Sequence, residues 1–182
     1  PDLCADRIDY FLRDSKTYGD WKVEHFVESL KTTGRMFVLD DKEIAAEYGK
    51  KYAEADEEWW ANPKEVAVLE IFAEAVKEAL EKDIITEEEL FGTDEEVMEA
   101  LRETENEIIQ EKLSLLDQGF EINLGAENPD LEVTTKARAV DPPVVVDGEV
   151  HKVSEFSEEL SQKIEEHEEF VKSGYSMNIL EK

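Results

Sequence analysis

The sequence predicts a mostly α-helical protein of the α+β class, with a small antiparallel β element in its C-terminal third. Three observations lead to this fold class. Apolar residues recur at three- and four-residue steps through most of residues 1–118, which is the period of an amphipathic helix. Strand-like alternation and most of the prolines fall in residues 119–182. The chain has 182 residues, 41% of them hydrophobic, and can therefore bury a core.

The helical part, residues 1–118, is predicted to begin with short elements and to continue with two long helices. A helix is expected at 3–14, a short amphipathic segment at 22–30, a hairpin turn and strand at 32–39, and the long helices at 42–60 and 64–82. Asp40 or Asp41 can cap the first long helix. Asn62-Pro63 separates the two, and their short connection predicts that they pack antiparallel.

The remaining elements are predicted from local capping and turn signals. Thr86 with Glu89 and Thr93 with Glu96 are capping boxes, for helices at 87–91 and near 94–102. A further helix at 104–116 ends at Gly119. The second part, residues 119–182, has strand signals at 120–124, 133–140 and 175–180, a hairpin at 144–153 around Asp147-Gly148, and a helix at about 158–173 between Ser157 and Gly174.

Composition excludes several classes of partner. The chain has 48 Asp and Glu against 20 Lys and Arg, a formal net charge of -28. This charge argues against binding nucleic acid or an anionic membrane, since both are negatively charged. The single cysteine, Cys4, cannot form an internal disulfide. We therefore predict a cytoplasmic protein. Its excess of Glu and Lys fits either heat adaptation or salt adaptation, and both remain open.

The segment Ala5–Asp14 carries the residues most suggestive of chemistry. On a helix, Asp6, Tyr10 and Asp14 line up at steps of four and could present two carboxylates and a phenol to one pocket. Divalent cations such as Mg²⁺ bind carboxylate oxygens, and an arginine such as Arg7 can bind phosphate. The alternative is a solvated helix whose i,i+4 ion pairs each contribute only tenths of a kcal/mol.

This segment resembles the last motif of the HD-domain metal-dependent phosphohydrolases. In that family a His, then a His-Asp pair, then a distant Asp assemble the site, and the final Asp begins a helix with the pattern Asp-Arg/Lys-x-Asp-Tyr-x-x-Arg-Asp. Residues 6–14 match every defined position, and Leu3-Cys4-Ala5 is similar to the usual lead-in. The later order of elements, with Lys136-Ala137-Arg138 and Asp141-Pro142, is similar to one branch of the family.

The resemblance implies a role for each matching residue. Asp6 would be the fourth protein ligand to a divalent metal, which could be Mn, Mg, Fe, Co or Ni. Arg7 and Tyr10 would bind the phosphates and sugar of the substrate, and Asp14 would bind a sugar hydroxyl. The substrate would be a phosphorylated small molecule, such as a nucleotide, attacked at phosphorus by metal-bound water. Residues 1–118 would continue an HD-type domain.

The chain departs from the family at the other ligands. His25, His151 and His167 all follow the motif, there is no His-Asp dipeptide, and each histidine is expected to be a surface or packing residue. We therefore expect a C-terminal portion of a phosphohydrolase, with no catalytic residue of its own and with the missing ligands on an N-terminal segment. The alternative is a non-catalytic acidic helical module that binds a protein partner or forms a homo-oligomer.

Two other features have simpler interpretations. Trp59-Trp60, at the end of the helix at 42–60, could form a ligand platform, but core packing with one exposed ring is favoured. The glutamates on either side of His167 are expected to be a solvated helix face.

Residues 1–182 alone are expected to bind Mn²⁺ weakly and to hydrolyse no nucleotide, because one carboxylate does not hold a catalytic cation tightly. Calorimetry with Mn²⁺ and a phosphate-release assay on a nucleotide panel measure this. Robust turnover by the purified 182-residue chain would contradict the expectation.

Overall fold

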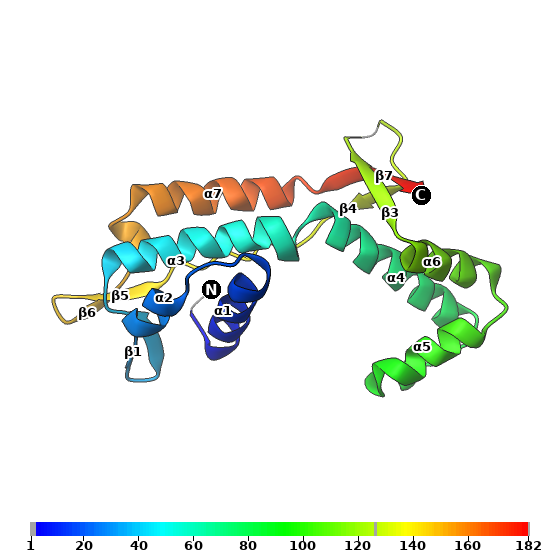
Figure 1. Ribbon diagram of the computed structural model, residues 1–182, viewed down its shortest axis with the longest axis horizontal. Helices are drawn as coiled ribbons and strands as arrows, with labels where there is room; N and C mark the ends of the chain where they lie inside the picture. Colours follow the sequence, from blue (N-terminus) through cyan, green and yellow to red (C-terminus); the bar gives the residue numbers. More distant parts are fainter. Residues whose placement is uncertain (1–2, 126, 182) are drawn as a thin grey trace. The chain divides into compact units, whose positions relative to one another are not determined.

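The computed structural model describes residues 3–125 and 127–181, which form two compact units (Figure 1). Unit 1 contains the described residues up to Asn62 together with Thr135–Ser173. Unit 2 contains Pro63–Thr134 and the described residues from Gly174 onward. The change in composition expected to divide the chain at 118/119 lies inside unit 2. One unit boundary instead follows Asn62, where the sequence predicts a break between two helices.

Unit 1 combines helices with two β-hairpins. Its elements are α1 (Ala5–Tyr18), α2 (Glu24–Ser29), β1 (Leu30–Thr33), β2 (Met36–Leu39), α3 (Lys42–Ala55), a π-helical turn η1 (Asp56–Trp60), β5 (Pro143–Val146), β6 (Glu149–Lys152), a 3₁₀ turn η3 (Val153–Glu155) and α7 (Glu158–Lys172).

Unit 2 combines three helices with a small sheet. Its elements are α4 (Pro63–Glu81), a 3₁₀ turn η2 (Glu89–Phe91), α5 (Asp94–Glu103), α6 (Glu107–Gln118), β3 (Phe120–Leu124), β4 (Leu131–Val133) and β7 (Tyr175–Glu181). The predicted fold class, mostly α with small antiparallel β elements, is confirmed. The predicted helix at 87–91 is only a 3₁₀ turn, although the Thr86–Glu89 hydrogen bonds are present.

The sheet of unit 1 joins two hairpins that lie far apart in the sequence. Its strand order is β1-β2-β5-β6, with both hairpins antiparallel and a parallel pairing of Leu39 with Val144 between them. The predicted Asp147-Gly148 turn is confirmed, since both residues have positive φ (51° and 85°), as a type I′ turn requires. The parallel contact brings β5 next to α3.

The sheet of unit 2 has the order β3-β7-β4, and both pairings are antiparallel. The strand predicted at 133–140 is wrong except at its first residue, since β4 spans Leu131–Val133. After Thr134 the chain passes into unit 1, and residues 135–142 pair with no strand among the described residues. The predicted strand segment up to Val140 thus lacks a ladder of backbone hydrogen bonds, and the backbone N–H of Arg138 instead donates to the Asp56 carboxylate.

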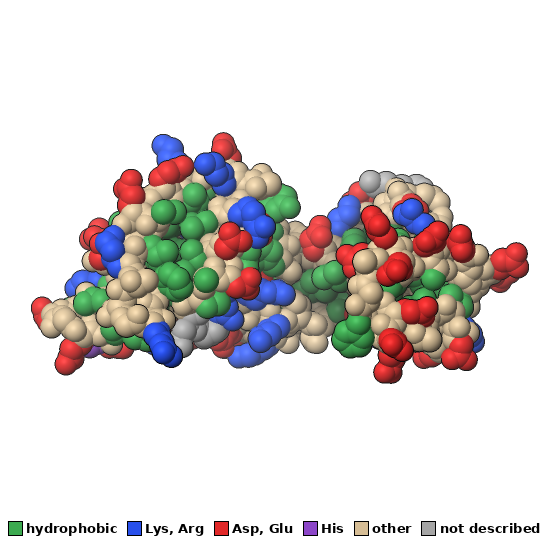
Figure 2. Space-filling view, turned by 90° about the horizontal axis from the view of Figure 1, so that it is seen from below, with side chains coloured by type: hydrophobic (Ala, Val, Ile, Leu, Met, Phe, Trp, Pro, Cys, Tyr) green, Lys and Arg blue, Asp and Glu red, His purple; other side chains and the backbone are tan. Residues whose placement is uncertain are grey.

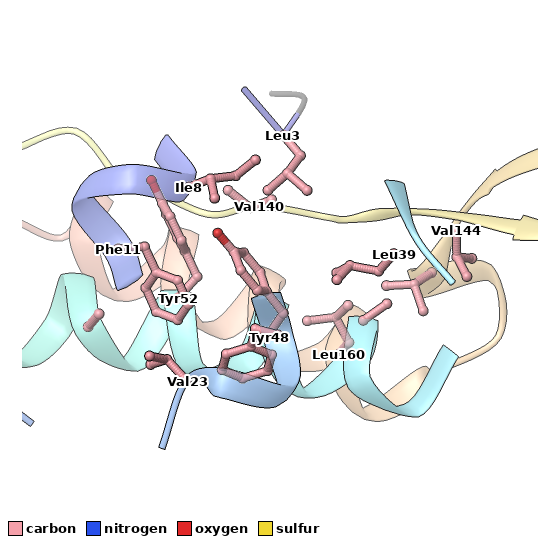
Figure 3. Packing of buried hydrophobic residues seen from close by; sticks show 14 residues of the cluster. Leu3, Ile8, Phe11, Val23, Leu39, Tyr48, Tyr52, Val140, Val144 and Leu160 are labelled. Atoms are coloured by element: carbon pink, nitrogen blue, oxygen red, sulfur yellow. The ribbon is translucent and has the colours of Figure 1, made fainter. Parts of the chain in front are cut away.

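The core of unit 1 is centred on aromatic rings shared by α1, α2 and α3. Phe11 is fully buried, and its ring centroid lies 4.6 Å from that of Tyr48 and 5.3 Å from that of Tyr52 (Figure 3). Leu160 of α7 and Val140 belong to the same core. This packing fixes the rotation of α1, and hence which of its side chains remain accessible.

Unit 2 buries two apolar clusters. One lies between α4 and the three-stranded sheet and includes Ile71, Phe120 and Met177. The other is formed by α4, α5 and α6 and includes Leu101 and Ile109. The helices α3 and α4, predicted to pack antiparallel, find their main helical partners within their own units, α7 for α3 and α6 for α4.

The surface of both units carries many carboxylates, as Figure 2 shows for one face. Some have a local structural role. The side chain of Asp41 accepts hydrogen bonds from the backbone N–H groups of Glu43 and Ile44, and Thr93 with Glu96 forms the predicted capping box. Within the described residues, every helix is too short or too polar to cross a bilayer.

A glycine allows the close approach of α3 and α7. A Cβ atom on Gly49 would lie 2.8 Å from Leu160 Cδ1 and 3.0 Å from the carbonyl oxygen of Val140. Gly49→Ala is therefore expected to lower the free energy of unfolding by about 1–3 kcal/mol, although alanine is the better helix former. Urea denaturation measures the change. The cost should shrink in a Leu160→Ala background, and a net stabilisation by Gly49→Ala would contradict the prediction.

Candidate functional site

The residues of the Asp6–Asp14 motif are arranged by the packing of α1 in unit 1. Ile8 and Phe11 point into the core and are buried. Tyr10 and Asp14 lie on the flank of this face and are half-buried. The motif is thus helical throughout, and its polar residues differ clearly in their surroundings.

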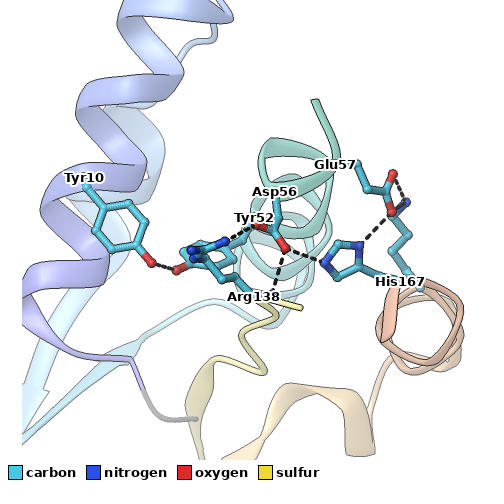
Figure 4. Close-up of polar contacts among 7 residues, drawn as sticks. Tyr10, Tyr52, Asp56, Glu57, Arg138 and His167 are labelled. Carbon is cyan, nitrogen blue, oxygen red and sulfur yellow. Dashed lines mark hydrogen bonds and ion pairs between the residues drawn. The ribbon is translucent and has the colours of Figure 1, made fainter. Parts of the chain in front are cut away.

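Tyr10 is held by two aromatic residues from the C-terminal end of α3 and from η1. Its hydroxyl forms a hydrogen bond with the hydroxyl of Tyr52, as Figure 4 shows. Its ring meets that of Trp60 edge-on, with centroids 4.9 Å apart and an interplanar angle of 85°. Burial raises the pKa of Tyr52 and the hydrogen bond with Tyr10 raises it further, so the Tyr52 hydroxyl stays protonated at neutral pH.

Asp14 is held by the same cluster. The indole Nε1–H of Trp60 donates to Asp14 Oδ2 over 3.0 Å, across 46 residues of sequence. A carboxylate has more acceptor positions than one indole N–H can use. The contact therefore orients Asp14 and leaves it able to accept a further hydrogen bond.

Arg7 and Asp6 lie on the first turns of α1. Arg7 is half-buried, and its positive charge opposes the rise in the pKa of Tyr52. Asp6 is exposed, and its carboxylate makes no hydrogen bond or ion pair with the described residues. Asp9 is exposed too, but forms an ion pair with Arg13 at 3.1 Å. The structure therefore gathers Tyr10 and Asp14 into one cluster and leaves Asp6 apart from it.

The described residues do not by themselves form a metal site. Residues 3–125 and 127–181 contain no group of three or more His, Cys, Asp or Glu side chains placed to share a cation. Stable binding of a divalent metal takes several oxygen or nitrogen ligands. Asp6 alone does not meet this requirement, so any metal held by this carboxylate needs ligands from elsewhere.

The structure also shows a buried charge cluster that the sequence analysis did not identify. His167 of α7 is completely buried, which agrees with the packing alternative and not with the surface alternative expected for this histidine. Its Nε2 atom lies 2.9 Å from Asp56 Oδ2 and its Nδ1 atom lies 3.0 Å from Glu57 Oε1 (Figure 4). Both carboxylates belong to η1, which also carries Trp60.

Two further cations complete this cluster. Arg138 donates to Asp56 from its backbone N–H (2.8 Å) and from Nη1 (3.2 Å). Lys163 Nζ lies 2.9 Å and 3.0 Å from the two oxygens of Glu57. Asp56 is as completely buried as His167, so these partners replace the water that its charge would otherwise require. The signal in the sequence was three consecutive acids, Asp56–Glu58, directly before two tryptophans, but nothing in it pointed to the partners of Asp56 and Glu57.

Comparison with known proteins finds two relatives of this chain. It is 33% identical over 184 residues to an uncharacterized protein, YdhJ, of Bacillus subtilis, a match that covers 99% of this chain and 56% of the relative. It is 31% identical over 160 residues to the metal-dependent phosphohydrolase cns2 of Cordyceps militaris, covering 82% of this chain and 46% of the relative. The chain spans about half the length of both.

These similarities extend over most of the chain, including both units. No family model and no solved structure matches it. The chain is therefore similar to a protein named as a metal-dependent phosphohydrolase, and its own activity is a matter for proposal.

The hydrogen bond between Trp60 and Asp14 is expected to contribute measurably to stability. Asp14→Ala should lower the free energy of unfolding by about 1–2 kcal/mol, because it leaves a half-buried indole N–H without its charged acceptor. Asp9→Ala, on the same helix, is the matched control and should cost no more than about 0.5 kcal/mol, since its ion pair is exposed. Urea denaturation compares the two, and equal effects would contradict the prediction.

The stability of the chain should also depend on pH through His167. Burial alone would lower the pKa of His167, but hydrogen bonds and charge from Asp56 and Glu57 outweigh it, and the pKa is raised. The stabilisation is therefore complete below the unfolded-state pKa of about 6.5 and is lost as pH rises through the folded-state value. Thermal unfolding across this range should show the loss in the wild-type chain and in His151→Gln, but not in His167→Gln.

Proposed function

We propose that this chain is part of an HD-type metal-dependent phosphohydrolase that acts on nucleotides or other phosphate esters. In this proposal residues 1–118 continue the HD-type domain and 119–182 form a smaller subdomain. The observation that carries the proposal is the cluster on α1, where Tyr10 and Asp14 are held by Tyr52 and Trp60. Two residues that the motif assigns to substrate binding are thus oriented before any substrate arrives.

The similarity to cns2 supports the same function. A helix whose charged residues formed only ordinary ion pairs would not need to fix Tyr10 and Asp14 through contacts more than 40 residues away in sequence. Asp9 and Arg13 show what such an ordinary pair looks like on the same helix, since both are largely exposed. All four residues occupy defined positions of the motif, and the long-range contacts fall on Tyr10 and Asp14, two of the residues to which the resemblance assigns substrate binding.

The proposed contacts with substrate follow from the chemistry of each side chain. Asp14 keeps acceptor positions for a sugar hydroxyl, while its contact with Trp60 fixes its orientation. Tyr10 offers a hydroxyl whose direction is set by Tyr52. Arg7, half-buried on the preceding turn, supplies the positive charge that a phosphate group requires. All three belong to one helix, so their relative positions are fixed.

Asp6 is proposed as one ligand of a divalent metal whose other ligands lie outside these 182 residues. Its exposure and its lack of partners among the described residues leave its carboxylate accessible to such a shared site. The length of the relatives supports this arrangement, since this chain spans only about half of each. On this proposal the isolated chain is inactive.

A second candidate function, a non-catalytic acidic module that binds a protein partner or a second copy of the chain, is favoured by the surface of unit 2. Phe91 is 91% exposed and Leu69 is 64% exposed, on a unit whose helices carry many glutamates. Exposed apolar side chains of this kind mark a contact surface where they form a contiguous patch. Sedimentation of the chain alone, across concentrations, tests self-association.

The test of the proposed enzyme uses a longer protein that contains this sequence, purified with Mn²⁺ or Mg²⁺ and assayed for phosphate release from a panel of nucleotides. Asp6→Asn is expected to reduce activity or metal affinity about 100-fold or more, because even the loss of a residue supporting a metal ligand costs 10–100-fold. Glu28→Gln, at an exposed carboxylate outside the motif, is the control and should retain activity. Equal activity of wild type and Asp6→Asn would contradict the proposal.

A further inference from the structure

The cluster around His167 connects to the substrate-binding residues proposed on α1. Asp56 and Glu57, which hold His167, begin the π-helical turn η1, and Trp60, which holds Asp14 and Tyr10, ends it. We propose that His167 is a positioning residue: its protonated imidazole fixes η1 and thereby places Trp60 against Tyr10 and Asp14. This inference rests on the proposed function only where it concerns substrate.

The geometry requires a protonated imidazole. Both ring nitrogens of His167 face a carboxylate oxygen, at 2.9 Å and 3.0 Å. An ionised carboxylate only accepts hydrogen bonds, and a neutral imidazole has only one N–H to donate. Both contacts can be hydrogen bonds at once only when both nitrogens carry a proton. Loss of one proton therefore breaks one of the two contacts with η1.

The backbone of η1 forms a π-helical turn. In η1 the backbone N–H of Ala61 donates to the carbonyl oxygen of Asp56, five residues earlier, instead of the usual four. Such π-helical turns are rare and occur often at functional sites. The wider turn changes the direction in which the side chains of η1 point, and Trp60 is the last residue of η1. Releasing Glu57 or Asp56 frees the turn to relax and moves Trp60.

The surroundings of His167 determine the direction of the effect. The groups that face it are Asp56 and Glu57 from η1, Lys163 on its own helix, and Arg138 on the segment that follows Thr134. With His167 neutral, Arg138 still pairs with Asp56 and Lys163 with Glu57. The carboxylates therefore keep a counter-charge, and Lys163 still joins Glu57 to α7, but one of the two hydrogen bonds from the His167 ring to η1 is lost. We expect a local rearrangement rather than unfolding.

The experiment follows Trp60 and His167 separately by NMR on the ¹⁵N-labelled chain. The chain has three tryptophans, and Trp60→Phe identifies the indole N–H signal that belongs to Trp60. Long-range ¹H–¹⁵N spectra report the protonation of the His167 ring. As pH rises from 6 to 9, the Trp60 indole signal is expected to move upfield, as its hydrogen bond to Asp14 weakens, with the same midpoint as His167.

Two variants test the cause. His167→Gln should abolish the pH-dependent movement of the Trp60 signal, whereas His151→Gln, which alters a histidine that faces Glu155 at an exposed site, should leave it unchanged. Glu57→Gln keeps a side chain of the same shape but removes one charge, so the midpoints of His167 and Trp60 should both move to lower pH together. This variant and the wild-type titration decide the matter even if His167→Gln does not fold.

Several results would overturn the inference. A Trp60 signal that stays constant while His167 titrates would show that the turn does not respond to the imidazole. Movement that persists in His167→Gln would assign it to another group. A His167 ring that is neutral at pH 6 would remove the basis of the proposal.

The readout does not depend on enzymatic activity. If the longer protein hydrolyses no nucleotide while Trp60 follows His167, the proposed function fails and the positioning role stands. If the longer protein is active, KM should rise above the midpoint more than kcat falls, since Tyr10 and Asp14 are proposed to bind substrate. An active enzyme whose Trp60 signal ignores His167 would support the function and overturn the positioning role.

Discussion

The packing of Phe11 against Tyr48 and Tyr52 is the contact on which the arrangement of unit 1 depends. It buries one face of α1 against α3 and so determines which residues of the motif are held and which face solvent. Tyr52 contributes to both the packing and the polar contacts. Its ring packs on Phe11, and its hydroxyl forms a hydrogen bond with that of Tyr10. The burial of the Phe11 ring is not directional, but it places Tyr52 so that the hydroxyl groups of Tyr52 and Tyr10 have a defined orientation.

The charge cluster at the end of α3 solves a different physical problem. A carboxylate as buried as Asp56 is costly unless it is paired and fully hydrogen-bonded, and here two cations and a backbone N–H provide the compensation. The resulting network joins η1, α7 and the segment around Arg138. Three parts of the chain that are remote in sequence thus meet where unit 1 carries its tyrosine and tryptophan cluster.

Local features of this fold could be predicted from the sequence, and remote ones could not. The Asp147-Gly148 turn, the Thr93–Glu96 capping box and the end of α6 at Gly119 depend only on neighbouring residues, and all are confirmed. The partners of Asp56 are 82 and 111 residues away, and a sequence without aligned relatives contains no signal that pairs them. Likewise the motif named Tyr10 and Asp14, but their contacts with Tyr52 and Trp60 required coordinates.

The position of β7 at the centre of its sheet has a consequence for synthesis of the protein. The two strands on either side of it, β3 and β4, are made about 50 residues earlier and have no hydrogen bonds with each other. Until residues 175–181 leave the ribosome, both expose unpaired backbone edges, which are prone to wrong pairings. All of unit 1 precedes Gly174 in the sequence, so unit 1 can fold before β7 completes the sheet of unit 2. Nascent chains of this protein would therefore depend most on chaperones between the synthesis of β4 and that of β7.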